Sequence, residues 1–290
     1  MMRDDVVVTF MSHKHDIVGS IPAPAILEAV KKNSKSNIKR RDALSDYTGA
    51  EVSGMVSNSA LNVERYLKGL RSYDWNPINT PAIMKNVQNE ISRLKLEMSS
   101  KLNKDVVGMV GISSEATEAN LKRIGARIQL RPVPSNLIQN EIFLVGTLIS
   151  GFVDEQIARA SAIVNLGVQG GKSVAQVSEE LQALFDMAKV RADRIARTEM
   201  LRVHSMTDFS RAEEIQQYIP NMRKVWNSTF KPNAREDHIE AHNRYNENPI
   251  PMDEEFEIGG ELAMFPRDPK LSVAQSVNCT CYITYVEGKE

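Results

Sequence analysis

The sequence has few cysteines and no long apolar run. Only two of its 290 residues are cysteine, Cys279 and Cys281, and a disulfide across one intervening residue is strained. The sequence contains no stretch of about 18 uncharged apolar residues, the length that a transmembrane helix needs. We therefore expect neither a disulfide scaffold nor a membrane contact, and a chain made in a reducing cytoplasm.

The first residues also lack the features of a secretory signal. Residues 1–5 include Asp4 and Asp5, where a signal peptide has a basic segment. Motifs that bind phosphate through a glycine-rich loop, or that carry a catalytic zinc pair or a nucleophile elbow, are also missing from the sequence. These absences disfavour the common classes of nucleotide-binding and hydrolytic enzyme.

Positive and negative charges balance over the whole chain but not along it. Lys and Arg number 36 against 37 Asp and Glu, a net charge of -1, which argues against a protein that coats DNA by charge alone. Basic residues exceed acidic ones by six in residues 1–140, whereas acidic residues are in excess by two in residues 141–250 and by five in residues 251–290. This segregation predicts two surfaces with different neighbours.

The basic excess includes one short run near the start of the chain. Such a run is either a solvated face or a contact to phosphate groups or an acidic partner. Small residues between Gly49 and Ser59 follow it, so we interpret residues 1–57 as a basic N-terminal arm that ends in a mobile connector. The cations of the run are Lys31, Lys32, Lys35, Lys39, Arg40 and Arg41.

Helical periodicity dominates the middle of the chain. Thr80 and Pro81 form an N-cap and first-turn pair, and apolar residues then recur every three or four positions. An apolar-rich helix is predicted from about residue 136, with Gly170 and Gly171 as its end. We expect residues 58–135 to be a helical region and residues 136–290 to form a further domain.

From about residue 191 the chain changes character. A charged helix is followed by a strand-like segment around Trp226, by short segments broken by proline and glycine, and by the β-branched and aromatic residues 281–286. The predicted fold class is α+β. It consists of a mainly helical N-terminal part followed by a compact C-terminal module with short antiparallel strands.

Two pairs of residues in the C-terminal module suggest a metal site. His238 and His242 share one face of a helix, and Cys279 and Cys281 share one face of a strand. Two imidazoles and two thiolates form a tetrahedral Zn²⁺ ligand set, and four protein ligands would make the metal structural rather than catalytic. The alternative is a buried, hydrogen-bonded histidine beside two cysteines that act as small apolar core residues.

A third candidate lies in the charged helix. Arg197, Thr198 and Glu199 project in three directions, so a buried helix cannot expose all of them to solvent. We expect Arg197 or Glu199 to anchor neighbouring backbone through charge-assisted hydrogen bonds. A catalytic role for Glu199 is disfavoured because no second acid stands at a fixed offset.

The order of several short motifs resembles that of one protein family. The motifs are the segments Arg194–Glu199, Val225–Thr229, Arg235–His238, Phe265–Pro269 and Asn278–Cys281. Over residues 140–286 the series resembles the phage Mu F-like minor head proteins, also called phage head morphogenesis proteins. His238 matches the family histidine and His242 has no counterpart. The structural motif residues are Arg197, Thr198, Glu199, Trp226, Arg235, His238, Asn278, Cys279 and Cys281.

The resemblance implies a non-enzymatic component of a tailed double-stranded DNA phage. Such a protein is a minor structural or assembly protein at the portal vertex or capsid interior, with a role in procapsid assembly, DNA packaging or DNA delivery. Its implied partners are the portal protein, capsid or scaffold proteins and packaged DNA. Its implied location is the virion, after assembly in the host cytoplasm. The alternatives are a metal-dependent hydrolase or nuclease built on His238 and His242, and a cytoplasmic nucleic-acid-binding module.

Overall fold

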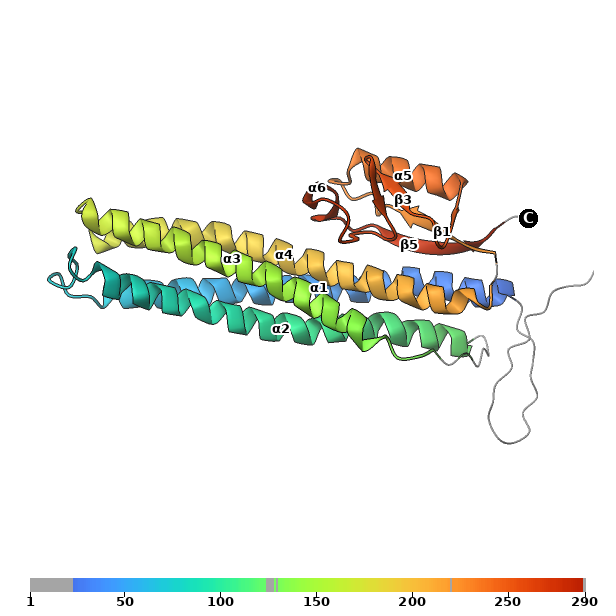
Figure 1. Ribbon diagram of the computed structural model, residues 1–290, viewed down its shortest axis with the longest axis horizontal. Helices are drawn as coiled ribbons and strands as arrows, with labels where there is room; N and C mark the ends of the chain where they lie inside the picture. Colours follow the sequence, from blue (N-terminus) through green and yellow to red (C-terminus); the bar gives the residue numbers. More distant parts are fainter. Residues whose placement is uncertain (1–22, 124–127, 129, 220, 289–290) are drawn as a thin grey trace, which may run out of the picture. The chain divides into compact units, whose positions relative to one another are not determined.

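The computed structural model describes residues 23–123, 128, 130–219 and 221–288. Four long helices come first and a mixed module follows (Figure 1), which confirms the α+β class. The helices are α1 (Ala23–Lys68), α2 (Thr80–Arg123), α3 (Ser135–Gln169) and α4 (Val174–Gln216). The module contains β1 (Met222–Asn227), α5 (Glu236–Glu247), β2 (Ile250–Pro251), β3 (Phe256–Ile258), β4 (Glu261–Ala263), α6 (Val273–Ser276) and β5 (Tyr282–Glu287).

The chain divides into two compact units, and each takes part of the long helices. The helical unit comprises residues 45–106 and 139–199. The mixed unit comprises residues 107–138 and 200–290 together with the described part of residues 1–44. The predicted region 136–290 is therefore shared between the two units, because α3 and the first part of α4 pack with other helices rather than with the strands.

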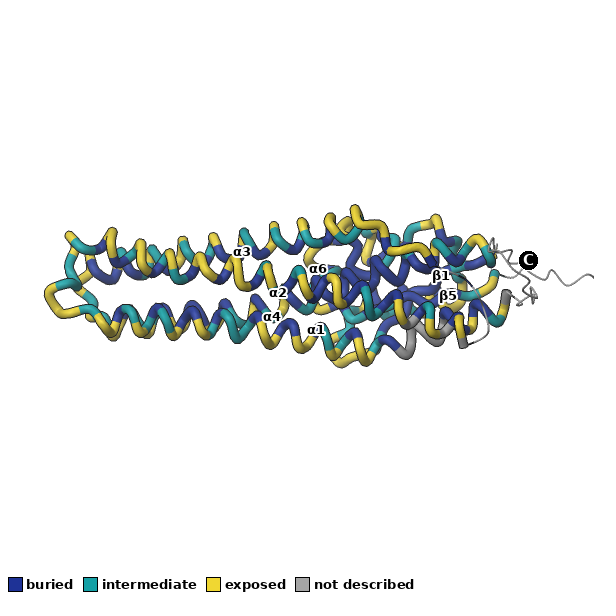
Figure 2. The backbone as a smooth tube through the Cα atoms, turned by 90° about the horizontal axis from the view of Figure 1, so that it is seen from below, coloured by how far each residue is buried: buried dark blue, intermediate teal, exposed yellow. Residues whose placement is uncertain are grey.

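In the helical unit, segments of α1 to α4 run side by side and bury one apolar stripe each (Figure 1). On α2, the predicted stripe of Ile83, Val87, Ile91, Leu94 and Met98 is at most 2% exposed. The buried residues follow the inner sides of the helices as a continuous band (Figure 2). Burial of such stripes, at about 25 cal/mol per Å² of apolar surface, is the main stabilising term for these helices.

Among the described residues, α3 is the one helix that is long and apolar enough to cross a membrane by length and composition alone. In the helical unit the same helix contributes Val145, Ile149 and Val153, none of which has exposed surface. Only part of its apolar surface is used in this interior, because 28% of the apolar window is buried and Phe143, Leu148 and Leu166 are exposed.

The small residues after the basic run do not form the predicted connector. Helix α1 continues without a break from Ala23 to Lys68, so the predicted boundary at residue 57 falls inside it. Gly49 is buried, and a Cβ at this position would lie 2.3 Å from Oδ1 of Asp193 on α4. Glycine there allows two helices to approach closely, and this packing outweighs its weak helix propensity.

The mixed unit is built on an antiparallel sheet with the order β2-β1-β5. Its register pairs Lys224 with Tyr285 and Trp226 with Ile283, so these four side chains share one face. Strands β3 and β4 form a separate hairpin. Its turn residues, Gly259 and Gly260, both have positive φ (57° and 80°), as a two-residue turn of this kind requires.

Two glycines of α3 test how tightly α3 and α4 pack. A Cβ at Gly167 would lie 2.3 Å from Cγ2 of Val177 on α4, which has no exposed surface. We expect Gly167→Ala to destabilise the protein by about 1–3 kcal/mol through overpacking. The control is Gly151→Ala on the same helix, where nothing lies within 4 Å of the added Cβ, and which should stabilise by about 0.5–1 kcal/mol. Urea unfolding measures both, and equal effects would contradict the close contact.

Candidate metal centre

Three of the four predicted ligands meet at one point inside the mixed unit. His238 lies in the first turn of α5, and its ring packs edge-on against Trp226 with a centroid separation of 5.6 Å. Cys279 and Cys281 lie just before β5. The three residues are only 2–4% exposed, so solvent has almost no access to the cluster.

The distances within this cluster match those of a metal site. Nδ1 of His238 lies 3.3 Å from Sγ of Cys281 and 3.5 Å from Sγ of Cys279, and all three candidate ligand atoms lie within 4.8 Å of one another. Bond lengths of about 2.3 Å for Zn–S and about 2.0–2.1 Å for Zn–N place tetrahedral N and S ligands about 3.5 Å apart. The pocket therefore has the right size for Zn²⁺.

His242 is not part of this cluster, so the predicted fourth ligand is wrong. It lies one turn further along α5, where its Nδ1 is 3.0 Å from the side-chain amide of Asn246. Its ring packs edge-on against Phe230 at 4.7 Å. Spacing along a helix placed both histidines on one face, but only the first turn of α5 faces the cysteine segment.

A hydrogen-bond chain fixes the orientation of the His238 ring. Nε2 of His238 lies 2.9 Å from Oε1 of Gln275 on α6. Nε2 of Gln275 donates in turn to Asp237 Oδ2 at 2.9 Å. Because an amide nitrogen can only donate, Oε1 must be the acceptor, and the proton of the neutral His238 ring is then on Nε2. The lone pair of Nδ1 is left facing the two sulfur atoms.

Two buried arginines hold the backbone of the cysteine segment. Nη1 of Arg267 donates to the carbonyl of Cys279 at 2.6 Å, and Nη2 donates to the carbonyl of Cys281 at 3.1 Å and to Ser205 on α4. Arg41 donates to the carbonyl of Thr280 at 3.4 Å and pairs with Asp42. Both guanidinium groups are 0% exposed, so they interact with other groups of the protein and not with solvent.

The two thiols have opposite pKa shifts. Burial opposes ionisation of Cys279, but the hydrogen bond from Cys281 and the charge of Arg267 contribute to a pKa of this thiol well below its ordinary value. The hydrogen bond to Cys279, together with burial, raises the pKa of Cys281.

The other motif residues divide between the two units. Arg235 donates to the carbonyl of Val277 at 2.6 Å, and Asn278 has a positive φ of 58°. Both therefore shape the same segment as the cysteines. By contrast, Arg197 pairs with Asp46 and Asp193 in the helical unit. Thr198 and Glu199 are buried there, 5% and 7% exposed. The side chains of α4 that bond to Arg267 and to Tyr285 on β5 come later in the helix, at Ser205 and Asp208.

The basic run is only partly a surface feature. Lys39 and Arg40 are exposed, and Arg40 makes a 4.0 Å ion pair with Glu115. The prediction that Arg41 contacts DNA or a partner is wrong, because its side chain is enclosed and bonded as described above. On helix α1, Arg41 lies on the buried face, whereas Lys39 and Arg40 lie on the exposed face. The side chains of Lys31, Lys32 and Lys35 lie outside the described residues.

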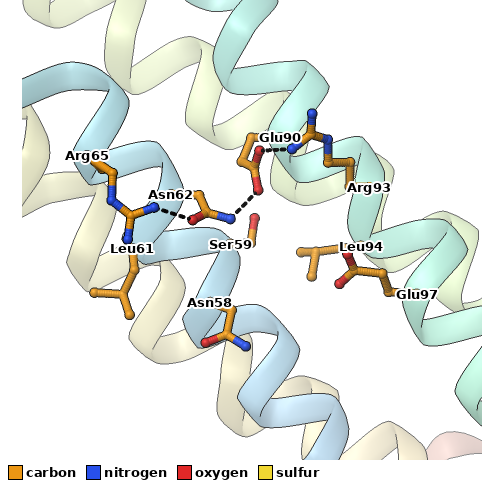
Figure 3. Close-up of a pocket in the computed structure, with 9 residues that line it drawn as sticks. All are labelled: Asn58, Ser59, Leu61, Asn62, Arg65, Glu90, Arg93, Leu94 and Glu97. Atoms are coloured by element: carbon orange, nitrogen blue, oxygen red, sulfur yellow. Dashed lines mark hydrogen bonds and ion pairs between the residues drawn. The ribbon is translucent and has the colours of Figure 1, made fainter. Parts of the chain in front are cut away.

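An open polar groove between α1 and α2 lies in the helical unit (Figure 3). Several of its polar side chains bond to one another: Asn62 donates to Glu90 at 2.7 Å, and Arg93 pairs with the same carboxylate at 3.0 Å. Arg65 donates to Asn62 at 3.0 Å. These contacts join the two helices across the groove.

The fold and the site together define a structural α+β domain whose motif residues are largely buried. Residues 160–284 match the family model described as Phage Mu protein F like protein. This segment contains every motif residue named above and all three residues of the cluster. This segment is therefore similar to the Mu F-like phage head morphogenesis proteins, which confirms the resemblance and associates the matched residues with a phage head family.

Two curated relatives share part of this region. The chain is 33% identical over 128 residues to the uncharacterized protein YqbB of Bacillus subtilis, which covers 43% of this chain and 40% of YqbB. It is 32% identical over 137 residues to NAD(+)–arginine ADP-ribosyltransferase EFV of Enterococcus faecalis, which covers 47% of this chain and 27% of that protein. The chain thus spans less than half the length of either relative. No solved structure matches it.

Sequence reasoning missed Arg267, Gln275 and Ser205. Arg267 stands inside the motif Phe265–Pro269, but nothing in the sequence indicated that it would be buried beside Cys279. Gln275 and Ser205 belong to none of the motifs. These residues become partners only through contacts across 37 to 62 residues of sequence, which no local periodicity reveals.

Replacement of Arg267 tests the importance of its three-point anchor. We expect Arg267→Lys to destabilise the protein by about 2–4 kcal/mol, because one ammonium cannot reproduce the planar set of bonds to two carbonyls and Ser205. Arg244→Lys is the matched control, since Arg244 is exposed and makes a 3.4 Å ion pair with Glu257 and a cation–π contact with Tyr245. Its effect should stay within about 0.5 kcal/mol. Similar urea midpoints for the two variants would refute the anchor.

A buried carboxyl links β5 to α4. Asp208 on α4 is 7% exposed and accepts a hydrogen bond from the Tyr285 hydroxyl at 3.3 Å. Burial raises the pKa of Asp208 to about 7, against the smaller opposing effects of Tyr285 and Arg41. The folded state therefore holds this proton more tightly than the unfolded chain. Its stabilisation is complete below pH 4 and is lost as the pH rises through 7.

Asp208→Asn should remove this pH dependence while it keeps an acceptor for Tyr285. Between pH 5 and pH 8, we expect the unfolding free energy of the unmodified protein to fall by about 2–3 kcal/mol relative to the variant. Urea unfolding at both pH values measures the difference. Parallel pH profiles for the two proteins would show that Asp208 is already ionised at pH 5.

Proposed function

We propose that this protein is a minor structural or assembly component of a tailed double-stranded DNA phage head, located at the portal vertex or in the capsid interior. The observation that carries the proposal is the family match over residues 160–284. The architecture supports it, because the motif residues of the mixed unit are consumed in holding one backbone segment. Because these motif residues are buried, the outer surface of the domain is left for contacts with other proteins, as we expect of a structural component.

The enclosed cluster also argues for a structural rather than an enzymatic role. His238, Cys279 and Cys281 are only 2–4% exposed, so a substrate in solution has almost no access to them. The ADP-ribosyltransferase relative shares only 27% of its length with this chain, so its activity is not transferred here. The portal protein, or capsid and scaffold proteins, are the proposed partners.

The distribution of exposed charges suggests which kinds of partner the protein contacts. Lys39 and Arg40 are exposed cations on α1 and are available to packaged DNA or to an acidic protein surface. On the mixed unit, Asp253, Glu254 and Glu257 are exposed and favour a basic partner. The two surfaces would allow one chain to contact unlike neighbours in the head.

The test is the composition of purified particles from the phage or prophage that encodes the chain. We expect mass spectrometry of gradient-purified heads to detect this protein at low copy, and deletion of its gene to lower the yield of infectious particles. Complementation with Lys39→Glu plus Arg40→Glu should restore less infectivity than complementation with the unmodified gene. Glu240→Gln, on the exposed side of α5, is a control that should restore it fully. Heads that lack the protein in a fully infectious stock would refute the proposal.

A further inference from the structure

The cluster in the mixed unit has the features of a metal site, independently of any role in the phage head. We propose that Nδ1 of His238 and Sγ of Cys279 and Cys281 bind one Zn²⁺ ion, and that Gln275 is the positioning residue that holds the imidazole for it. The described residues supply three ligands, so the fourth position belongs to a small exogenous ligand such as water. The ion would join α5 to the segment before β5.

The tautomer of His238 is the first argument. A metal-binding histidine typically donates its other ring N–H to a carbonyl or carboxylate, which fixes the ring and raises the basicity of the ligating nitrogen. Here Nε2 faces Oε1 of Gln275 at 2.9 Å, and Asp237 holds the amide of Gln275 in that orientation. The chain Asp237–Gln275–His238 therefore presents the Nδ1 lone pair to both sulfur atoms.

The surroundings of this chain preserve its geometry. A Cβ at Gly259 would lie 2.3 Å from Nε2 of Gln275 and 2.4 Å from Oδ2 of Asp237. Gly259 also has a positive φ of 57°. The β3–β4 turn is thus shaped to leave room for the Asp237–Gln275 hydrogen bond, which is otherwise remote from the hairpin in sequence.

The donor set indicates which ion binds. Two thiolates and one imidazole favour Zn²⁺ over Mg²⁺ or Ca²⁺, which prefer oxygen ligands. The guanidinium of Arg267 lies beside the cluster, with Nη1 3.7 Å from Sγ of Cys279. Its N–H group is placed to share the negative charge that the metal-bound sulfur retains. Nε of Arg267 is buried and has no partner among the described residues, which leaves one further donor near the site.

The experiment measures metal in the full-length protein, purified with its thiols reduced and dialysed without chelator. We expect about one Zn²⁺ per chain by inductively coupled plasma mass spectrometry, and less than about a tenth of that in Cys279→Ser or Cys281→Ser. His242→Asn is the matched control and should retain the metal, because its side chain lies outside the cluster. Loss of Zn²⁺ in His242→Asn equal to that in the cysteine variants would contradict the assigned ligands.

A second measurement does not depend on variants that fold. Co²⁺ added to metal-free, unmodified protein should produce a thiolate-to-metal charge-transfer absorption, and Zn²⁺ should abolish it. Folded protein with reduced thiols that contains almost no Zn²⁺ and gives no such absorption would overturn the site. Because both readouts use purified protein, their failure would leave the head role untouched.

The role of Gln275 requires its own test. Gln275→Leu should weaken Zn²⁺ affinity about 10–100-fold in competition with a chromophoric chelator. Gln275→Glu combined with Asp237→Asn, which keeps an acceptor for the His238 N–H and a donor–acceptor pair between residues 237 and 275, should recover part of the loss. Val273→Ala, on the exposed side of α6 (77% exposed), is the control. Unchanged affinity in Gln275→Leu would show that the imidazole needs no such support.

Discussion

The fold of the mixed unit depends on how the buried guanidinium of Arg267 binds the segment before β5. This one group contacts the carbonyls of Cys279 and Cys281 and the hydroxyl of Ser205. It therefore connects that segment to the long helix α4. A buried arginine is costly to desolvate, and Arg267 also adopts a positive φ of 64°, a conformation that costs a non-glycine residue of order 1–3 kcal/mol. Both costs are tolerated because three acceptors converge on one planar group.

The same principle explains why the motif residues are spread so widely through the sequence. Arg235 and His238 stand at the start of α5 and Arg267 lies in the loop after β4, yet each binds the segment from Gln275 to Cys281. This segment has little regular structure of its own apart from the short helix α6, so its backbone groups must be satisfied by side chains. The motif residues of the mixed unit are thus largely the hydrogen-bond partners of one irregular segment.

Local periodicity predicted much of the fold and only part of the site. The stripe from Ile83 to Met98, the start of α2 at Thr80 and the end of α3 near Gly170 follow from helix geometry and capping, which act over a few residues. The continuity of α1 through Gly49 could not be predicted, because it depends on the close approach of Asp193 from another helix. For the same reason, His238 and the cysteines could be paired by their chemistry, whereas the exclusion of His242 required the orientation of α5. Arg41 shows that a charged residue in a basic run need not be exposed, because its side chain is fully buried.

Several buried polar groups act on β5 and the residues before it, so their energetic effects are coupled. Asp208 bonds to Tyr285 on the strand, Arg267 holds the carbonyls that precede it, and the His238–cysteine cluster lies at the same end. A change that displaces the segment at one of these points alters the geometry at the others, and contributions of residues that share partners are not additive. The segment is consequently either held at all of its contacts or released as a unit. This cooperativity gives a small sheet of three strands a single well-defined arrangement.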